Sequence, residues 1–92
     1  MVDLSDREND FILCLSNHVE GHPTRRIERG ELYALAKTNG FSEQEVYRYA
    51  MDLDLSGYLK AQPILGGKIA SLCLTAQGVD YARGLRDQQK PL

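Results

Sequence analysis

Apolar positions repeat with a helical period up to about residue 57 and alternate with polar positions after it. In the first part, hydrophobic residues recur every three or four positions, a spacing that places them on one face of a helix. The intervening HPTRRIERGE segment is basic and aperiodic, which predicts a loop or a short edge strand. The helical spacing predicts three helices: about Asp6–Glu20, about Glu31–Thr38, and a third from the Ser42 cap to Gly57.

Local signals mark the ends of these helices. Ser5 with Glu8, and Ser42 with Glu45, have the S-x-x-E spacing of a capping box. In that motif two side chains satisfy backbone N–H groups at a helix start. Glycines at positions 21, 40 and 57 follow the predicted helices, because glycine tolerates the left-handed backbone of a helix end.

Two alternating runs predict a β-hairpin at Tyr58–Ile64 and Lys68–Leu74. The LGG segment between them contains Gly66 and Gly67, which supply the positive φ angles of a tight connection. Pro63 has no backbone N–H, so the first strand is expected to have an exposed edge there.

A last helix is expected after Thr75, whose hydroxyl can cap its start. Val79, Ala82 and Leu85 recur at helical spacing and are predicted to face inward. Gly78 has no side chain, so this helix can lie close to the hairpin. The resulting fold class is α+β, mostly helical.

The composition is that of one folded domain spanning residues 1–92. Hydrophobic residues make up 42% and charged residues 26% of the chain, as is typical of soluble globular domains. The QQKPL tail, about residues 88–92, is expected to fray. No apolar run reaches the ~18 residues of a membrane span, and the acidic start lacks a signal-peptide pattern. A cytoplasmic protein without membrane contact is therefore expected.

Three features, in order, resemble the winged helix-turn-helix superfamily. Ala36, Gly40 and Val46 have the +4 and +6 spacing of many bacterial helix-turn-helix units, in which alanine permits close packing and glycine takes the left-handed turn. The segment LDLSGYLKAQ resembles the junction of a third helix with a first wing strand. LCLTAQGVDYA resembles the junction into a closing helix, and the likeness extends from the first helix to Ala82.

This resemblance, closest in size and layout to small stand-alone bacterial or phage proteins, implies a three-helix core, a two-stranded β wing and a C-terminal helix. It also implies a transcriptional regulator that reads duplex DNA with the third helix and touches the DNA backbone with the wing. Because winged helices also serve as interaction modules, the alternative is a protein-interaction or dimerisation module that does not bind DNA.

The third predicted helix supplies a candidate base-reading face. Helical geometry of ~100° per residue turns Gln44, Arg48, Met51 and Leu55 outward, with Tyr47 at their side. In the major groove, glutamine pairs with adenine and arginine with guanine, and a tyrosine hydroxyl can bond a phosphate. The predicted residues of this face are Gln44, Tyr47 and Arg48.

Charge complicates this hypothesis. The net charge is −2, and four acids of the third helix oppose a bound phosphate: Glu43, Glu45, Asp52 and Asp54. Phosphate contacts supply most non-specific affinity, so cations elsewhere must compensate. The predicted phosphate contacts are Arg25, Arg26, Arg29, Lys37, Lys60 and Lys68, with the helix start at Ser42. If these cations do not lie on one side of the molecule, they are the ordinary charged residues of a solvated surface.

Apolar residues on predicted outer faces favour the alternative, a protein contact. Leu13 falls outside the buried stripe of the first helix, and Met51 and Leu55 are predicted on the outer face of the third. A second copy of the chain or another protein partner would cover them. Both functions are compatible, because many helix-turn-helix proteins bind DNA as dimers.

The sequence gives no support to a metal site or an enzyme. Cys14, His18 and His22 stand at i, i+4 and i+8, a spacing that can stack ligands on a helix. Gly21 and Pro23 are expected to end that helix before His22, and no fourth ligand is near. No catalytic set or phosphate-binding glycine loop is present. We therefore expect a non-enzymatic protein with reduced cysteines and neither metal nor cofactor.

Overall fold

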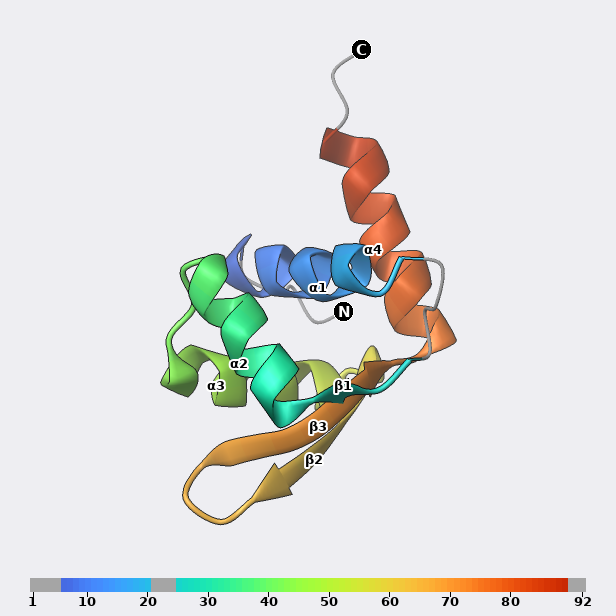
Figure 1. Cartoon of the computed structure of the whole chain (residues 1–92). Helices are drawn as coiled ribbons and strands as arrows, with labels where there is room; N and C mark the ends of the chain where they lie inside the picture. Colours follow the sequence, from blue (N-terminus) through green and yellow to red (C-terminus); the bar gives the residue numbers. More distant parts are fainter. Residues whose placement is uncertain (1–5, 21–24, 90–92) are drawn as a thin grey trace.

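A computed structural model describes residues 6–20 and 25–89 (Figure 1). The chain is α+β and mostly helical, as predicted, and the β2–β3 hairpin projects below α2 and α3 in Figure 1. The elements are α1 (Asp6–His18), β1 (Ile27–Glu28), α2 (Arg29–Thr38), α3 (Glu43–Leu55), β2 (Leu59–Ile64), β3 (Lys68–Leu74) and α4 (Ala76–Gln89).

Three element ends differ from the predictions by two residues. α1 ends at His18 instead of Glu20, and α2 begins at Arg29 instead of Glu31. α4 continues through Gln88 and Gln89, two residues into the tail that is predicted to fray. Ser5 of the first predicted capping box and residues 90–92 lie outside the described part of the chain.

The sheet has three antiparallel strands in the order β1-β3-β2, not the two strands of the predicted hairpin. β1 adds the third strand by pairing Ile27 with Leu72, so the short-strand option for the basic segment is confirmed. The hairpin itself forms at its predicted bounds to within one residue. Gly66 and Gly67 have φ angles of 91° and 69°, as the turn required.

The open edge of β2 is protected against further strand pairing. The backbone N–H of Ala61 donates to Oδ2 of Asp54 at 2.8 Å. Pro63 has no N–H, and the register shifts between Gln62 and Pro63. Because an unpaired edge invites another strand, these features block addition of a second chain along β2.

The turn between α2 and α3 forms as the sequence indicated. Ala36 and Val46 are buried, and Gly40 has a φ of 81°. At the start of α3, the Ser42 hydroxyl accepts from the Glu45 N–H at 3.1 Å, and the Glu45 carboxylate accepts from the Ser42 N–H at 3.0 Å. The second predicted capping box is therefore confirmed.

The core joins all these elements. Phe11 of α1 lies 5.3 Å from the Phe41 ring, centroid to centroid, and 6.0 Å from the Tyr49 ring. This aromatic cluster holds α1, the α2–α3 turn and α3 together, because buried aromatic side chains remove large apolar areas from water. The prediction that Leu13 is exposed on α1 is wrong, since only 7% of it is accessible.

α4 accounts for the burial of Leu13. Tyr81 of α4 donates to Asn9 at 2.6 Å, and Arg86 donates to Ser16 at 3.5 Å. Asn9, Leu13 and Ser16 stand at helical spacing on one side of α1. α1 therefore has two buried sides, one facing the sheet and α3 and the other facing α4.

α4 is anchored where the hairpin begins. The Thr75 hydroxyl donates to the Gly57 carbonyl at 2.7 Å and accepts the Gly78 N–H at 3.0 Å, so the predicted cap is confirmed. A Cβ at Gly78 would lie 1.8 Å from the carbonyl oxygen of Tyr58. The rings of Tyr58 and Tyr81 stack with centroids 4.5 Å apart. These contacts set the position of the hairpin relative to the helices.

Within residues 6–20 and 25–89, none of the helices combines the length and apolar character needed to cross a membrane.

Candidate nucleic-acid interface

The exposed stripe of α3 differs from the prediction at one position. Gln44, Arg48, Asp52 and Leu55 are exposed, at i, i+4, i+8 and i+11. Met51 is half-buried against the core and does not belong to this stripe. Gln44, Arg48 and Leu55 therefore lie on the outer face as predicted. The fourth residue of that face is Asp52 and not Met51.

The hairpin explains this difference. Tyr47, Met51 and Asp54 stand at i, i+4 and i+7, and so share one flank of α3. The bond between Asp54 and the Ala61 N–H shows that this flank faces β2. Tyr47 and Met51 are half-buried there, which makes Tyr47 a residue of the side and not of the outward face.

A charged network runs along the opposite flank of α3. Nη2 of Arg7 donates to the Glu45 carboxylate at 2.9 Å and to the Gly40 carbonyl at 3.0 Å. The Tyr49 hydroxyl donates to the same carboxylate at 3.0 Å. The Arg48 guanidinium lies over the Tyr49 ring, 5.1 Å from its centroid. The contact with the Tyr49 ring therefore restrains the Arg48 side chain in the free protein.

Arg7 is the member of this network that sequence reasoning missed. It lies 38 residues from Glu45 along the chain, so no local spacing connects the two. Its guanidinium also lies 4.5 Å from the centroid of the Phe41 ring. Arg7 therefore offsets the negative charge of Glu45, one of the four acids that would repel a phosphate.

The network predicts a loss of stability in acid. The Ser42 N–H first, and then Arg7, lower the pKa of Glu45 from 4.5 to about 2. A carboxylate with a depressed folded-state pKa contributes stability above pH 4.5 and loses that contribution as the pH falls towards 2. We expect Glu45→Gln, which preserves the capping geometry, to be less stable than wild type at pH 7.

Urea unfolding at a series of pH values measures this difference. The stability gap between wild type and Glu45→Gln should be constant above pH 4.5 and should narrow between pH 4.5 and 2. A gap that keeps the same size down to pH 2 would show that Glu45 is not held in its charged form by these contacts.

The start of α3 lies beside the hairpin. Nζ of Lys68 is 3.2 Å from the Glu43 carboxylate. The Ile69 N–H donates to the Tyr33 hydroxyl at 3.0 Å, which ties α2 to the same strand. The α3 N-terminus therefore lies next to the hairpin, and Gln44 is exposed directly after Glu43.

The helix start at Ser42 is less open to a phosphate than predicted. Its capping box already uses the N–H groups of Ser42 and Glu45. The carboxylates of Glu43 and Glu45 also stand in the first turn, where they interact favourably with the helix dipole and repel an anion. A phosphate at the N-terminus of α3 would therefore lie next to the carboxylate of Glu43 or Glu45.

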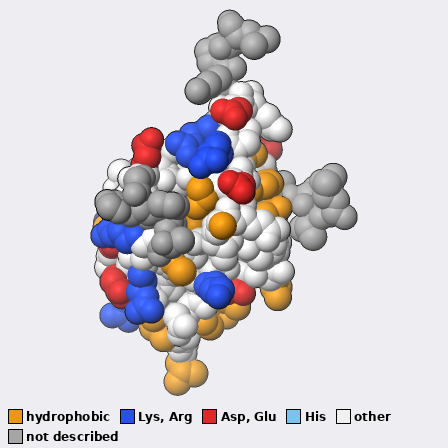
Figure 2. All heavy atoms as spheres, turned by 90° about the vertical axis from the view of Figure 1, so that its right-hand side faces the viewer, with side chains coloured by type: hydrophobic (Ala, Val, Ile, Leu, Met, Phe, Trp, Pro, Cys, Tyr) orange, Lys and Arg blue, Asp and Glu red, His pale blue; other side chains and the backbone are white. Residues whose placement is uncertain are grey.

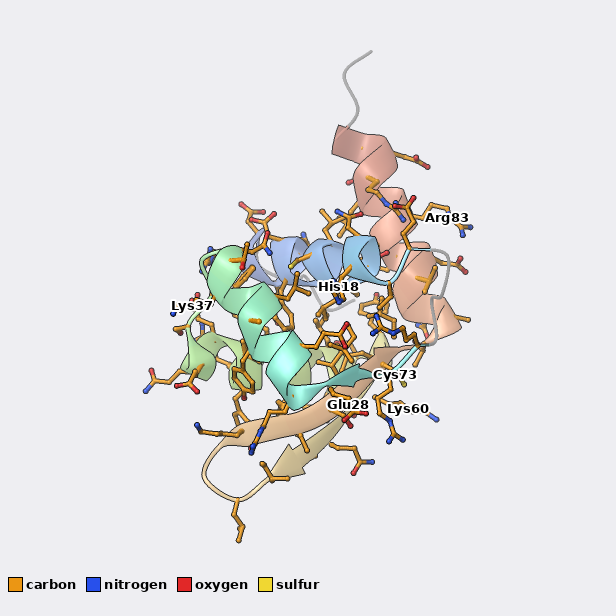
Figure 3. The ribbon with its side chains drawn as sticks, in the orientation of Figure 1. His18, Glu28, Lys37, Lys60, Cys73 and Arg83 are labelled. Atoms are coloured by element: carbon orange, nitrogen blue, oxygen red, sulfur yellow. The ribbon has the colours of Figure 1, made fainter. Side chains whose placement is uncertain are left out.

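The predicted cations do not converge on one side. Figure 3 shows Lys37 at one side of the molecule and Lys60 at the other, with Lys60 near Glu28 and Cys73. The register agrees, because Lys60 pairs with Cys73 on the neighbouring strand. Arg26, exposed directly before β1, is also at this sheet. Arg48 and Lys68 are the predicted cations that lie on or beside α3, with Lys37 in the last turn of α2. Arg7, which was not predicted, lies at the α3 N-terminus.

Arg25 is engaged by an acid instead of being available to a phosphate. Its guanidinium lies 2.8 Å from the Glu31 carboxylate, which also contacts the His18 ring. The hydrogen bond from His18 first, and then Arg25, lower the pKa of Glu31. His18 therefore has a hydrogen-bond partner in the fold, while His22 lies outside the described residues. Among the described residues, no group of three His, Cys, Asp or Glu side chains could hold a metal.

Asp52 is the acid of the exposed α3 stripe, where its charge would repel a phosphate. Desolvation, followed by the nearby Glu8 charge, raises the pKa of Asp52. Glu43 and Glu45 each have a cationic partner, and Asp54 accepts the β2 edge N–H. The outer stripe itself contains one positive and one negative side chain.

The hairpin end is the most apolar exposed part that the structure describes. Leu65 is 99% exposed, Ile64 is 40% exposed, and both line a shallow hollow with Pro63. Figure 2 shows hydrophobic side chains at the lower end of the molecule, where the hairpin ends in Figure 1. Sequence reasoning used this segment for its turn glycines and overlooked the consecutive P-I-L run before them.

Neither a protein-family model nor a curated protein matches this chain. The relation to any family therefore rests on the residues and the fold described above.

Proposed function

We propose that the chain is a winged-helix protein that binds duplex DNA as a transcriptional regulator, with α3 in the major groove and the β2–β3 hairpin as its wing. The element order and the geometry of Ala36, Gly40 and Val46 support this fold. The observation that carries the proposal is the surface shared by α3 and the hairpin. It presents Gln44 next to Glu43, the partner of Lys68, and Arg48 one turn further along α3. Such side chains pair with bases and bind phosphates in DNA recognition.

The hairpin adds electrostatic support. No Asp or Glu occurs between Asp54 and Asp80, the longest acid-free stretch of a chain with net charge −2. Lys60 and Lys68 lie within it. This stretch is therefore locally positive although the net charge of the protein is negative.

The acids of α3 limit the affinity. Asp52 and Glu43 lie within the Debye length of about 10 Å from a phosphate on the α3 surface, so they weaken binding at cellular salt. We therefore expect micromolar, strongly salt-dependent binding to random duplex, in the non-specific range of about 10⁻⁴–10⁻⁶ M.

A fluorescence anisotropy titration tests this expectation. At low salt, wild-type protein should bind a labelled random duplex of roughly 20 base pairs, and Lys68→Gln should weaken binding similarly on all sequences. The slope of log affinity against log salt should also fall by about 1 in that variant, since one phosphate contact is lost. Absence of binding at 100 µM protein, on the order of the weakest expected dissociation constant, would exclude the proposed function.

A protein-interaction role is the second candidate. Leu55, at the C-terminal end of α3, is 84% exposed, which is unusual for a surface that meets only nucleic acid. Sedimentation of wild type and Leu55→Ser without DNA tests for a protein contact at this position. A wild-type dimer that the substitution dissociates would support a protein contact at this position.

A further inference from the structure

The hairpin end has a chemistry that α3 lacks. Leu65 is almost completely exposed, and Pro63 and Ile64 precede it. Single exposed leucines are common on protein surfaces. Three consecutive apolar residues at the end of a projecting hairpin are not explained by packing, because that end points away from the core in Figure 1.

The shape of this end is narrow. Gly66 and Gly67 follow Leu65, and a Cβ placed on either would meet no atom within 4 Å. The turn therefore has open space on the side of its glycines and one large side chain, Leu65, at its tip. A minor groove about 6 Å wide excludes a two-stranded ribbon with its side chains, so the Leu65 side chain at the tip is the part that can enter it.

The charge around the tip fits a polyanion. Lys68 follows the turn glycines directly, whereas Lys60 lies nearer the other end of the hairpin, where it pairs with Cys73. The hairpin contains no acid of its own. Lys68 contacts Glu43 in the free protein, and a DNA phosphate can replace that carboxylate as its partner.

We propose that Leu65, supported by Ile64 and Pro63, inserts as an apolar wedge between base pairs in the minor groove of the bound duplex and bends it. This inference rests on the proposed function. Apolar side chains that enter the minor groove unstack a base step and kink the duplex by about 20–90°. Pyrimidine–purine steps such as TA kink most easily, so the wedge favours duplexes that have such a step under the hairpin.

Energy transfer between dyes at the two ends of a duplex with a central TA step measures the bend. Wild-type protein shortens the end-to-end distance on binding. Leu65→Ser retains affinity within about tenfold, because phosphate contacts supply most of the non-specific binding, but loses the bend. Gly84→Ser is the control, since it introduces the same side chain at an exposed position of α4 where an added Cβ meets nothing within 4 Å, and it bends the duplex as wild type does.

The possible failures are distinguishable. Binding by wild type without a change in end-to-end distance, or an equal bend with Leu65→Ser, overturns the wedge and leaves DNA binding intact. Absence of binding by wild type removes the proposed function and the wedge with it. Loss of self-association in Leu65→Ser, measured by sedimentation without DNA, assigns the tip to a protein contact and overturns the wedge.

Discussion

Gly78→Ala should destabilise the folded chain by about 3 kcal/mol, at the upper end of the usual cost of overpacking. The new Cβ would lie 1.8 Å from the Tyr58 carbonyl oxygen. That oxygen belongs to the backbone and accepts the Thr75 N–H at 3.1 Å, so it cannot rotate away as a side chain would. The start of α4 must move off the hairpin, and the stacked Tyr58 and Tyr81 rings must separate with it.

Gly84→Ala is the matched control for this prediction. Gly84 lies in the same helix, and a Cβ there meets nothing within 4 Å. Alanine should therefore stabilise α4 by up to about 1 kcal/mol through its better helix propensity. Thermal unfolding should show a melting temperature lowered by roughly 12–24 °C for Gly78→Ala, at about 4–8 °C per kcal/mol, and unchanged or raised for Gly84→Ala. Equal melting temperatures in the two variants would contradict the close packing of α4 on the hairpin.

The local parts of this fold were predictable because their signals are local. The second capping box, the glycine positions of the turns and the Thr75 cap each depend on residues a few positions apart. β1 was less certain because its two residues pair with Leu72 and Ser71, far along the chain. A two-residue strand has no period of its own to detect.

The burial of Leu13 and Met51 could not be predicted from helical period alone. A single amphipathic stripe assumes that a helix has one neighbour. α1 has α4 on a second side, and α3 has the hairpin along its flank, where Asp54 contacts the Ala61 N–H. Each extra neighbour widens the buried stripe, and these two apolar residues fall within the widened part.

In the candidate site, too, the local features were predictable and the contacts between separate elements were not. Gln44, Arg48 and Leu55 lie on the outer face because the period of α3 is strong. The pairing of Arg7 with Glu45, and of Lys68 with Glu43, depends on how separate elements meet. The six candidate cations do not share one side for the same reason, since β1 holds Arg26 at the edge of the sheet opposite β2.

Arg48→Glu should weaken DNA binding by about 10- to 100-fold. Arg48 is the only cation of the outer stripe of α3, and a good arginine–guanine pair contributes about 1–3 kcal/mol. The substitution also places a third acid beside Glu45 and Asp52, which adds repulsion of the nearby phosphates. Arg48→Gln, which removes the charge without reversing it, should have an intermediate effect.

Arg83→Glu controls for net charge. Arg83 lies on α4, away from Lys37 and the α3 end of the molecule in Figure 3, and it forms a 3.6 Å surface ion pair with Asp80. Exposed pairs of this kind contribute little stability. Both reversals change the net charge of the protein from −2 to −4, so any difference between them reports the position of the charge.

The ratio of the dissociation constants of Arg48→Glu and Arg83→Glu, measured by anisotropy on one duplex at about 50 mM salt, tests most directly whether the α3 face binds DNA. We predict that Arg48→Glu binds at least about tenfold more weakly than Arg83→Glu, with both variants folded by their thermal transitions. Equal dissociation constants for the two variants, with wild type bound more tightly than either, would contradict the account. Binding would then follow net charge and not the surface formed by α3 and the hairpin.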